Sequence, residues 1–162
     1  MTTPAQRRLI KDLEKINREG AEEFMASPLE DNLLIWSATI EGAEGTPWEG
    51  GLFTLKLQFS ESYPNSPPKV KFLSKMFHPN IYNDGRICLD SNYFAYLVLY
   101  NQWSPVYDVW ALLTAIKSLL LDPNTQSPAN MTASNIFKEN KLLYEVKVRE
   151  MVEKSLEMEN EE

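Results

Sequence analysis

Three short runs in the first half of the chain carry the two-residue hydrophobic period of half-buried antiparallel strands. The clearest is Gly51–Phe59, in which apolar side chains recur at every second position. The other two are Leu33–Ile40 and Lys69–Leu73. Segments rich in Gly or Pro, Glu41–Pro47 and Tyr63–Pro68, separate the three runs. The pattern therefore predicts an antiparallel meander joined by turns.

Helical patterns lie on both sides of these strands. Thr3-Pro4-Ala5-Gln6 has the form of a capping box with Pro at the first helical position, and Gly20 ends the helix that it starts. Val109–Leu121 predicts a buried helix because it is apolar on nearly all sides. Two more helices are expected at Ser134–Asn140 and Leu142–Leu156. The apolar face of the last helix is predicted to consist of Leu143, Val146, Met151 and Val152. A helix, a meander, a long loop and further helices together predict an α+β domain.

Composition is typical of one folded domain. The 162 residues are 43% hydrophobic and include four Trp, seven Tyr and seven Phe, which excludes a disordered chain. No apolar run reaches the roughly 20 residues of a membrane span, and the N-terminus has no apolar signal core. We therefore expect neither membrane contact nor secretion. A single cysteine suits a reducing compartment, and we expect the nucleus and the cytoplasm.

The net charge of −7 changes the expected partners. An acidic chain does not attract nucleic acid through its overall field, so we expect protein partners and no direct nucleic acid binding. The last ten residues hold five Glu and one Lys. This end either contacts a basic protein substrate or is only a solvating tail. We place the core domain at residues 1–155 and a short acidic tail at residues 156–162.

The one cysteine and the one histidine of the chain both lie in a thirteen-residue run, His78–Asp90. A single thiol cannot close an internal disulfide, so Cys88 is either an inert core residue or a nucleophile. Its neighbours decide between the two. The amide of Asn80, the Asn83-Asp84-Gly85 turn and the carboxylate of Asp90 are typical of a functional loop and not of an apolar core. One His and one Cys are too few for a metal site, and we expect none.

The run His-Pro-Asn-Ile-x-x-x-Gly-x-Ile-Cys-Leu-Asp resembles the active-site signature of ubiquitin-conjugating enzymes. Further motifs extend the resemblance over residues 3–155: Gly42–Gly50, Tyr63–Pro68, Trp103-Ser104-Pro105 and Asp122–Pro128. The resemblance implies an N-terminal helix, a four-stranded antiparallel meander, an active-site loop and C-terminal helices. Within the family, Met1–Leu9, Ser74–Asn80 and Ser127–Asn130 are most similar to the DNA-repair branch, which monoubiquitinates histone and the replication clamp.

The resemblance also implies a mechanism. Cys88 accepts ubiquitin as a thioester from the activating enzyme, which uses the ATP, and passes it to substrate lysines with a RING-type ligase. No bound cofactor and no adjacent general base are needed, because the incoming ubiquitin is already a thioester. Asn80 either stabilises the oxyanion of the transfer step or braces the loop, unless it only caps a turn. His78 is implied to be structural; as a base beside Cys88 it would instead indicate a cysteine hydrolase.

Other site residues follow from the same resemblance. His78, Pro79, Tyr82 and Asp90 are expected to support the active-site loop. On the acceptor side Ser127 stands where relatives often have Asp, so acceptor activation is expected to rely on the ligase.

Docking positions also carry over. The ligase is expected at Arg7, Asn65, Ser104 and Pro105. Asn65 replaces a large apolar side chain of many relatives, which favours a selective ligase. The activating enzyme is expected at Arg7, Arg8 and Lys11, although these cations also suit a plain solvated face.

One departure from the family pattern lies directly after the cysteine loop. Val98–Trp103 matches the family again, so Ser91–Leu97 is an insertion of seven residues. It has no charge and forms a run of eight apolar or aromatic residues with Val98–Tyr100. The insertion is either buried or, if it is exposed, a partner site or an aggregation liability. A third alternative is an in-frame segment that was not spliced out. It also supports an alternative function, an impaired or non-catalytic ubiquitin-binding module of the same fold.

Overall fold

A four-stranded antiparallel sheet forms the centre of the computed structural model, which describes residues 1–20, 23–87 and 103–160. The strands follow chain order, β1-β2-β3-β4. Their bounds are Phe24–Leu29 for β1, Asn32–Glu41 for β2, Leu52–Gln58 for β3 and Lys69–Phe72 for β4. The four-stranded meander implied by the resemblance is therefore confirmed.

Strand β1 is the strand that the hydrophobic pattern did not predict. It is a short strand at the edge of the sheet, with Pro28 opposite Trp36 of β2. The register shifts between Pro28 and Leu29, which is typical of an irregular edge. A strand that pairs on one side and contains Pro has a weak two-residue period, so its existence depends on β2 more than on its own residues.

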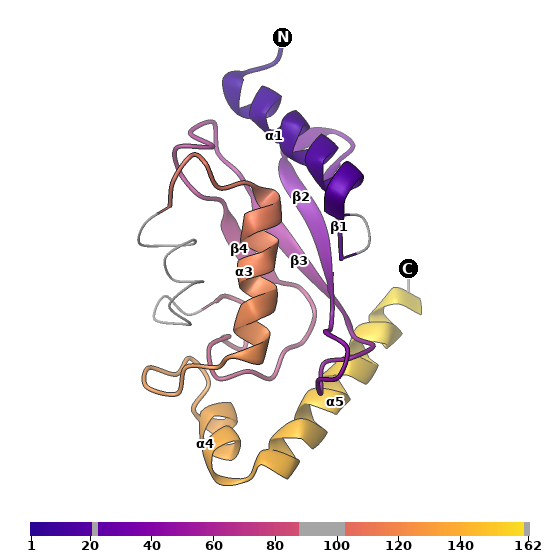
Figure 1. Cartoon of the computed structure of the whole chain (residues 1–162), viewed down its shortest axis with the longest axis vertical. Helices are drawn as coiled ribbons and strands as arrows, with labels where there is room; N and C mark the ends of the chain where they lie inside the picture. Colours follow the sequence, from indigo (N-terminus) through magenta and orange to yellow (C-terminus); the bar gives the residue numbers. More distant parts are fainter. Residues whose placement is uncertain (21–22, 88–102, 161–162) are drawn as a thin grey trace.

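Helices surround one face and both ends of this sheet (Figure 1). Helix α1 spans Pro4–Lys15 and continues into a π-helical turn, η1, at Ile16–Gly20. Helix α3 spans Val109–Leu121, as predicted. Helices α4 and α5 span Met131–Glu139 and Lys141–Asn160.

The predicted start of α1 is confirmed in atomic detail. Thr3 Oγ1 accepts a hydrogen bond from the Gln6 backbone N–H at 3.2 Å, and Gln6 Oε1 accepts one from the Thr3 N–H at 3.1 Å. This reciprocal pair satisfies two amides that the first helical turn leaves without a partner.

The hydrophobic core lies between the sheet and α3. Alternate residues of β3, Phe53, Leu55 and Leu57, are fully buried, and α3 contributes Leu112 and Ile116 from its inner face. In Figure 1, α3 crosses in front of the sheet, α1 lies at its upper end, and α4 and α5 lie at the lower end. This arrangement places the two ends of α3 beside the segments that carry the predicted site residues.

The buried face of α5 differs from the predicted one. Tyr144, Val148, Met151 and Val152 are buried, whereas Leu143 and Val146 are 38% and 54% exposed. Asn140 accepts from the Leu143 amide and starts the helix at Lys141, one residue before the predicted start. The packing of α5 against β3 determines which of its residues are buried. At this contact Ser155 Oγ accepts from the Leu52 N–H at 3.1 Å.

Both C-terminal helices also have different bounds from those predicted. Asn130 caps α4 by accepting from the Ala133 N–H at 3.0 Å, so the helix starts at Met131 and not at Ser134. Helix α5 continues to Asn160, so most of the acidic end is helical backbone. Of the helices in the described ranges, none combines the length and the apolarity needed to cross a membrane.

Candidate active site

The candidate nucleophile Cys88 lies outside the described residues, and so do Asp90 and the insertion Ser91–Leu97. The site is therefore defined by the segment that leads into Cys88 and by the loop that this segment contacts. These are residues 78–87 and residues 122–130.

Residues 81–87, which directly precede Cys88 in the sequence, form a tight bend. Ile81 and Ile87 form an isolated antiparallel bridge, and the Tyr82 N–H donates to the Arg86 carbonyl at 2.8 Å. Gly85 has φ +95°, and a Cβ at this position would lie 2.0 Å from the Phe72 carbonyl oxygen. Only Gly fits this conformation against β4. Gly85 and Arg86 are therefore held against β4, and Ile87, the last described residue before Cys88, is held by its bridge to Ile81.

His78 is a fully buried residue whose two ring nitrogens are both occupied. Nδ1 accepts from the Asn80 N–H at 2.9 Å, so the proton is on Nε2, which donates to the Leu119 carbonyl at 2.9 Å. Burial lowers the pKa of His78 to about 4, against the smaller opposing effect of the Leu119 carbonyl. The ring is neutral at pH 7 and has no free nitrogen to act as a base. This geometry favours the structural role over the cysteine hydrolase.

Asn80 is also fully buried and holds the loop that follows α3. Its Nδ2 donates to the Asn124 carbonyl at 2.7 Å, and its Oδ1 accepts from the Asn124 N–H at 2.8 Å. The adjacent Pro79 carbonyl accepts from the Ala129 and Asn130 amides at 2.8 and 3.1 Å. These four bonds, with that of His78, tie the predicted active-site loop to residues 119–130. In this state the Asn80 amide braces the loop.

The remaining loop residues are more accessible. Tyr82 is 38% exposed, and the Arg86 guanidinium lies 5.0 Å from the centre of its ring. Ser127 is exposed on the loop that Pro79 and Asn80 hold, and its place on the acceptor side stays a prediction. Pro79 itself is buried. The described residues hold no group of three or more His, Cys, Asp or Glu side chains that suits a metal ion.

The predicted ligase-docking residues converge at the other end of α3. Trp103 Nε1 donates to the Pro64 carbonyl at 2.7 Å and so brings residues 103–107 beside residues 63–66. Asn65 and Pro105 are exposed there, Ser104 is half-buried, and Arg7 is exposed on α1. Val106, which the sequence did not single out, is 81% exposed between them.

Arg8 has a different position from the one expected of a docking residue. Its Nε donates to Asp12 Oδ1 at 3.0 Å, and its two terminal nitrogens donate to the carbonyls of Pro105 and Tyr107 at 2.8 and 2.9 Å. The guanidinium is thus used within the fold, where it fixes the 105–107 segment to α1. Arg7 and Lys11 are exposed and stay the predicted contacts for the activating enzyme.

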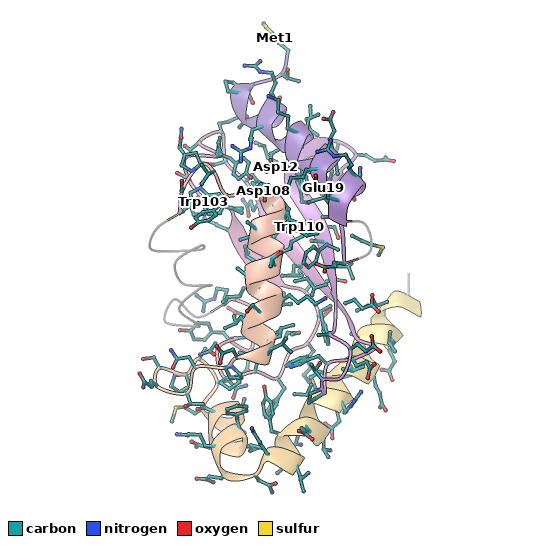
Figure 2. The ribbon with its side chains drawn as sticks, viewed as in Figure 1. Met1, Asp12, Glu19, Trp103, Asp108 and Trp110 are labelled. Carbon is teal, nitrogen blue, oxygen red and sulfur yellow. The ribbon has the colours of Figure 1, made fainter. Side chains whose placement is uncertain are left out.

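A buried pair of acids joins α1 to α3 beside this segment (Figure 2). Asp12 accepts from Arg8, from the Tyr63 hydroxyl and from the Val109 N–H. Burial raises the pKa of Asp12, although the hydrogen bonds from Tyr63 and Arg8 oppose the shift. Asp108 caps α3 through the Ala111 N–H at 2.9 Å and accepts from Lys15 Nζ at 2.6 Å.

Sequence reasoning missed this network. Asp108 had a usable signal, since an Asp directly before an apolar helix is a common N-cap.

Comparison with known proteins agrees with this architecture. The family model of ubiquitin-conjugating enzymes matches residues 8–152. Ubiquitin-conjugating enzyme E2 3 of Arabidopsis thaliana is 52% identical over 155 residues, which cover 96% of this chain and 99% of that protein. Ubiquitin-conjugating enzyme E2 2 of Saccharomyces cerevisiae is 50% identical over 157 residues, which cover 97% and 87%.

The α+β sheet, the clamped loop before a lone cysteine and these matches together place the chain in the ubiquitin-conjugating enzyme family. It is a transferase of the thioester-forming class. The activity of that class implies ubiquitin, an activating enzyme and a ligase as partners. The family that the sequence resembles is therefore confirmed.

Proposed function

We propose that Cys88 carries the ubiquitin thioester and transfers ubiquitin to a lysine of a protein substrate. The observation that supports this most directly is the bend before the thiol, in which the Gly85 carbonyl accepts from the Phe72 N–H of β4 at 2.9 Å and Arg86 is bridged to Lys71 of β4. A nucleophile that must meet a large partner repeatedly in the same geometry benefits from such a rigid approach. A thiolate suits the reaction because it is nucleophilic near neutral pH and leaves readily afterwards.

The chemistry balances without a bound cofactor. In charging, the Cys88 thiolate attacks the thioester carbon of ubiquitin on the activating enzyme, whose own thiolate leaves. ATP is consumed before this step. In transfer, the lysine amine attacks the Cys88 thioester, an isopeptide bond forms, the Cys88 thiolate leaves and the amine loses a proton. Asn80 is 2.7 Å from the Asn124 carbonyl and positions the loop around the tetrahedral intermediate. It can also donate to the oxyanion itself with its second amide hydrogen.

The narrower assignment is to the DNA-repair branch. Met1–Leu9, Ser74–Asn80 and Ser127–Asn130 carry that likeness. We accordingly propose a RING-type ligase at Asn65, Ser104, Pro105 and Arg7, a basic substrate such as histone, and a role in DNA-damage tolerance in the nucleus and cytoplasm. Direct contact with nucleic acid or with a membrane is not part of this proposal.

A charging assay tests the central proposal. With activating enzyme, ATP and ubiquitin, the native chain should shift by one ubiquitin mass, and reducing agent should reverse the shift. Cys88→Ser should give an ester that resists reducing agent and does not pass to lysine, because an alkoxide leaves far less readily than a thiolate. Cys88→Ala should give no shift. A Cys88→Ser variant that still discharged to lysine at the native rate would overturn the thioester mechanism.

A second candidate function, a non-catalytic ubiquitin-binding module, rests on the insertion Ser91–Leu97. The same assay separates the two functions, because such a module binds ubiquitin without a covalent shift. The native chain and a variant without the seven residues should be compared side by side. Charging by the shortened variant alone would show that the insertion blocks an otherwise intact site.

A further inference from the structure

A groove of about 590 Å³ crosses the outer face of β3 and β4 and reaches the bend before Cys88. Pro67 and Tyr82 form part of its apolar lining. Its charged lining consists of Lys56, Lys69, Lys71 and Arg86. No Asp or Glu is among the residues that line it. This is a local basic surface on a chain whose net charge is −7.

The strand register explains why these cations meet on one face. Lys56 of β3 lies directly opposite Lys71 of β4, and Gln58 lies opposite Lys69. Residues that are directly opposite share a face of the sheet, and here they face away from the core because Leu55 and Leu57 are buried. Like charges in directly opposed positions destabilise a strand pair. An anion between Lys56 and Lys71 would remove that repulsion.

The lysines form no ion pair within the described part of the chain, although the charge of Lys71 helps to lower the pKa of the nearby Asp84. Arg86 is paired with Asp84 at 2.7 Å, but the ion pairs of the described residues include none of Lys56, Lys69 and Lys71. Lys56, Lys69 and Lys71 are exposed. Three cations around an apolar floor match an anionic side chain that is attached to a protein segment better than a small free ion, since the floor offers apolar contact as well.

In the sequence, the residues that line the groove lead directly to Cys88. Lys71 is bridged to Arg86, which is two residues before Cys88, and Ile87 is adjacent to Cys88. Consecutive Cα atoms are about 3.8 Å apart, so a substrate segment with its lysine at Cys88 can reach the groove within a few residues.

We infer that this groove binds an acidic side chain of the substrate segment that carries the acceptor lysine. Lys69 and Lys71 are then specificity-determining residues for transfer. The inference rests on the proposed thioester at Cys88. The inference is compatible with a substrate that is basic elsewhere, because the acidic end of α5 and the basic groove lie at opposite ends of β3. The end of α5 packs near Leu52 at the start of the strand, and the groove lies at Lys56 and Gln58 near the end of the strand.

The test uses single-turnover discharge of the charged enzyme to synthetic peptides. Each peptide has one lysine and either aspartate or asparagine at one of four positions on either side of it; a third set has arginine. At the best position the native enzyme should discharge to the aspartate peptide about fivefold faster than to its asparagine match, the effect of one or two exposed ion pairs. The ratio should approach one at about 1 M salt, where such pairs are screened.

Charge reversal supplies the matched variants. In the double variant Lys69→Glu/Lys71→Glu the preference should invert, so that the arginine peptide becomes faster than the aspartate peptide. Lys138→Glu makes the same charge change at an exposed position of α4 and should keep the native preference. A native enzyme that charges but treats all peptides alike would overturn the inference and leave the proposed function intact. Failure to charge at all would overturn the proposed function first.

Two further outcomes also count against the inference. A preference for aspartate that survives in the double variant would place the acid elsewhere. Binding of a DNA oligonucleotide to the native chain that the double variant loses, without any preference among peptides, would assign the groove to nucleic acid instead.

Discussion

His78 and Asn80 lie two residues apart in the active-site loop and are both fully buried. Each side chain donates one hydrogen bond to a backbone carbonyl and accepts one from a backbone N–H. Their more distant partners, Leu119 and Asn124, are 41 and 44 residues away in sequence. The loop is thereby fixed to the end of α3 by polar groups that cannot be lost without leaving another buried group unsatisfied. Two testable consequences follow from this burial.

The first concerns pH. The pKa of His78 is about 4 in the folded chain and near 6.5 when the chain is unfolded. Between these values the unfolded state binds more protons, so the free energy of unfolding rises with pH and falls as pH drops from 6.5 to 4. The full effect is about 3 kcal/mol. Urea unfolding of the native chain at several pH values should show this loss.

His78→Gln provides the control because it removes the titrating group. The variant should be less stable at pH 7 but should lose less stability than the native chain between pH 6.5 and 4. Carboxylates titrate in both proteins and cancel in the difference. Parallel pH profiles for the two proteins would contradict the buried neutral imidazole.

The second consequence concerns Asn80. Asn80→Ala should leave charging of Cys88 nearly intact and slow discharge to lysine by about 10²-fold, the effect of losing one oxyanion donor or its positioning. Single-turnover charging and discharge should be measured separately, together with the midpoint of thermal unfolding. Equal losses in both steps, accompanied by a lower midpoint, would show that the amide only braces the loop.

At the scale of elements, α1 and α3 are joined by charges instead of by apolar contact alone. Lys15 of α1 pairs with Asp108 at the start of α3, and this hydrogen bond raises the pKa of Lys15. Asp12, which pairs with Arg8 within α1, accepts from the Val109 N–H of α3. Arg8 also holds the Pro105 and Tyr107 carbonyls. The segment that is predicted to contact the ligase is therefore positioned by the first helix.

We predict that Arg8→Ala costs about 1–3 kcal/mol of stability, because it leaves the buried Asp12 carboxylate and two carbonyls short of a donor. Amide exchange at Val106 and Tyr107 should also become faster. Arg7→Ala is the matched control, and its exposed side chain should change stability by no more than about 0.5 kcal/mol. Equal stability of the two variants in urea unfolding would show that the Arg8 contacts contribute little.

At the scale of the whole molecule, the charge of −7 is unevenly distributed. Cations line the groove at β3 and β4, whereas Glu153 and Glu157 are exposed near the end of α5. Separation of this kind allows one protein to attract opposite charges on different parts of a partner.

The acidic end can be tested without shortening α5. Replacement of Glu157, Glu159, Glu161 and Glu162 by Gln keeps the chain length and removes four negative charges. Modification of histone should then be slower at low salt, and the difference should fade as salt is raised. Discharge to free lysine, measured in parallel, controls for the chemical step. An unchanged rate with histone would make this end a solvating tail.

Local patterns were sufficient for the elements that are stabilised by their own residues. The capping box at Thr3–Gln6 and the apolar run Val109–Leu121 both form where the sequence predicts them. In each, the determining contacts lie within a few residues. The family was also identifiable from sequence, because the motif around Cys88 combines residue types that few other loops share. The roles of the docking residues stay predictions.

Tertiary structure decided the features whose partners are far apart in sequence. Strand β1 exists because β2 pairs with it, and the buried face of α5 is chosen by its contact with β3. Arg8 became an internal clamp because its carbonyl partners are 97 and 99 residues away. The basic groove likewise depends on the register of Lys56 against Lys71.

Sequence determined the chemistry and the family of this protein, because these depend on residue types and short spacings. Only the fold determined which charges meet, because burial and register are properties of the packed chain.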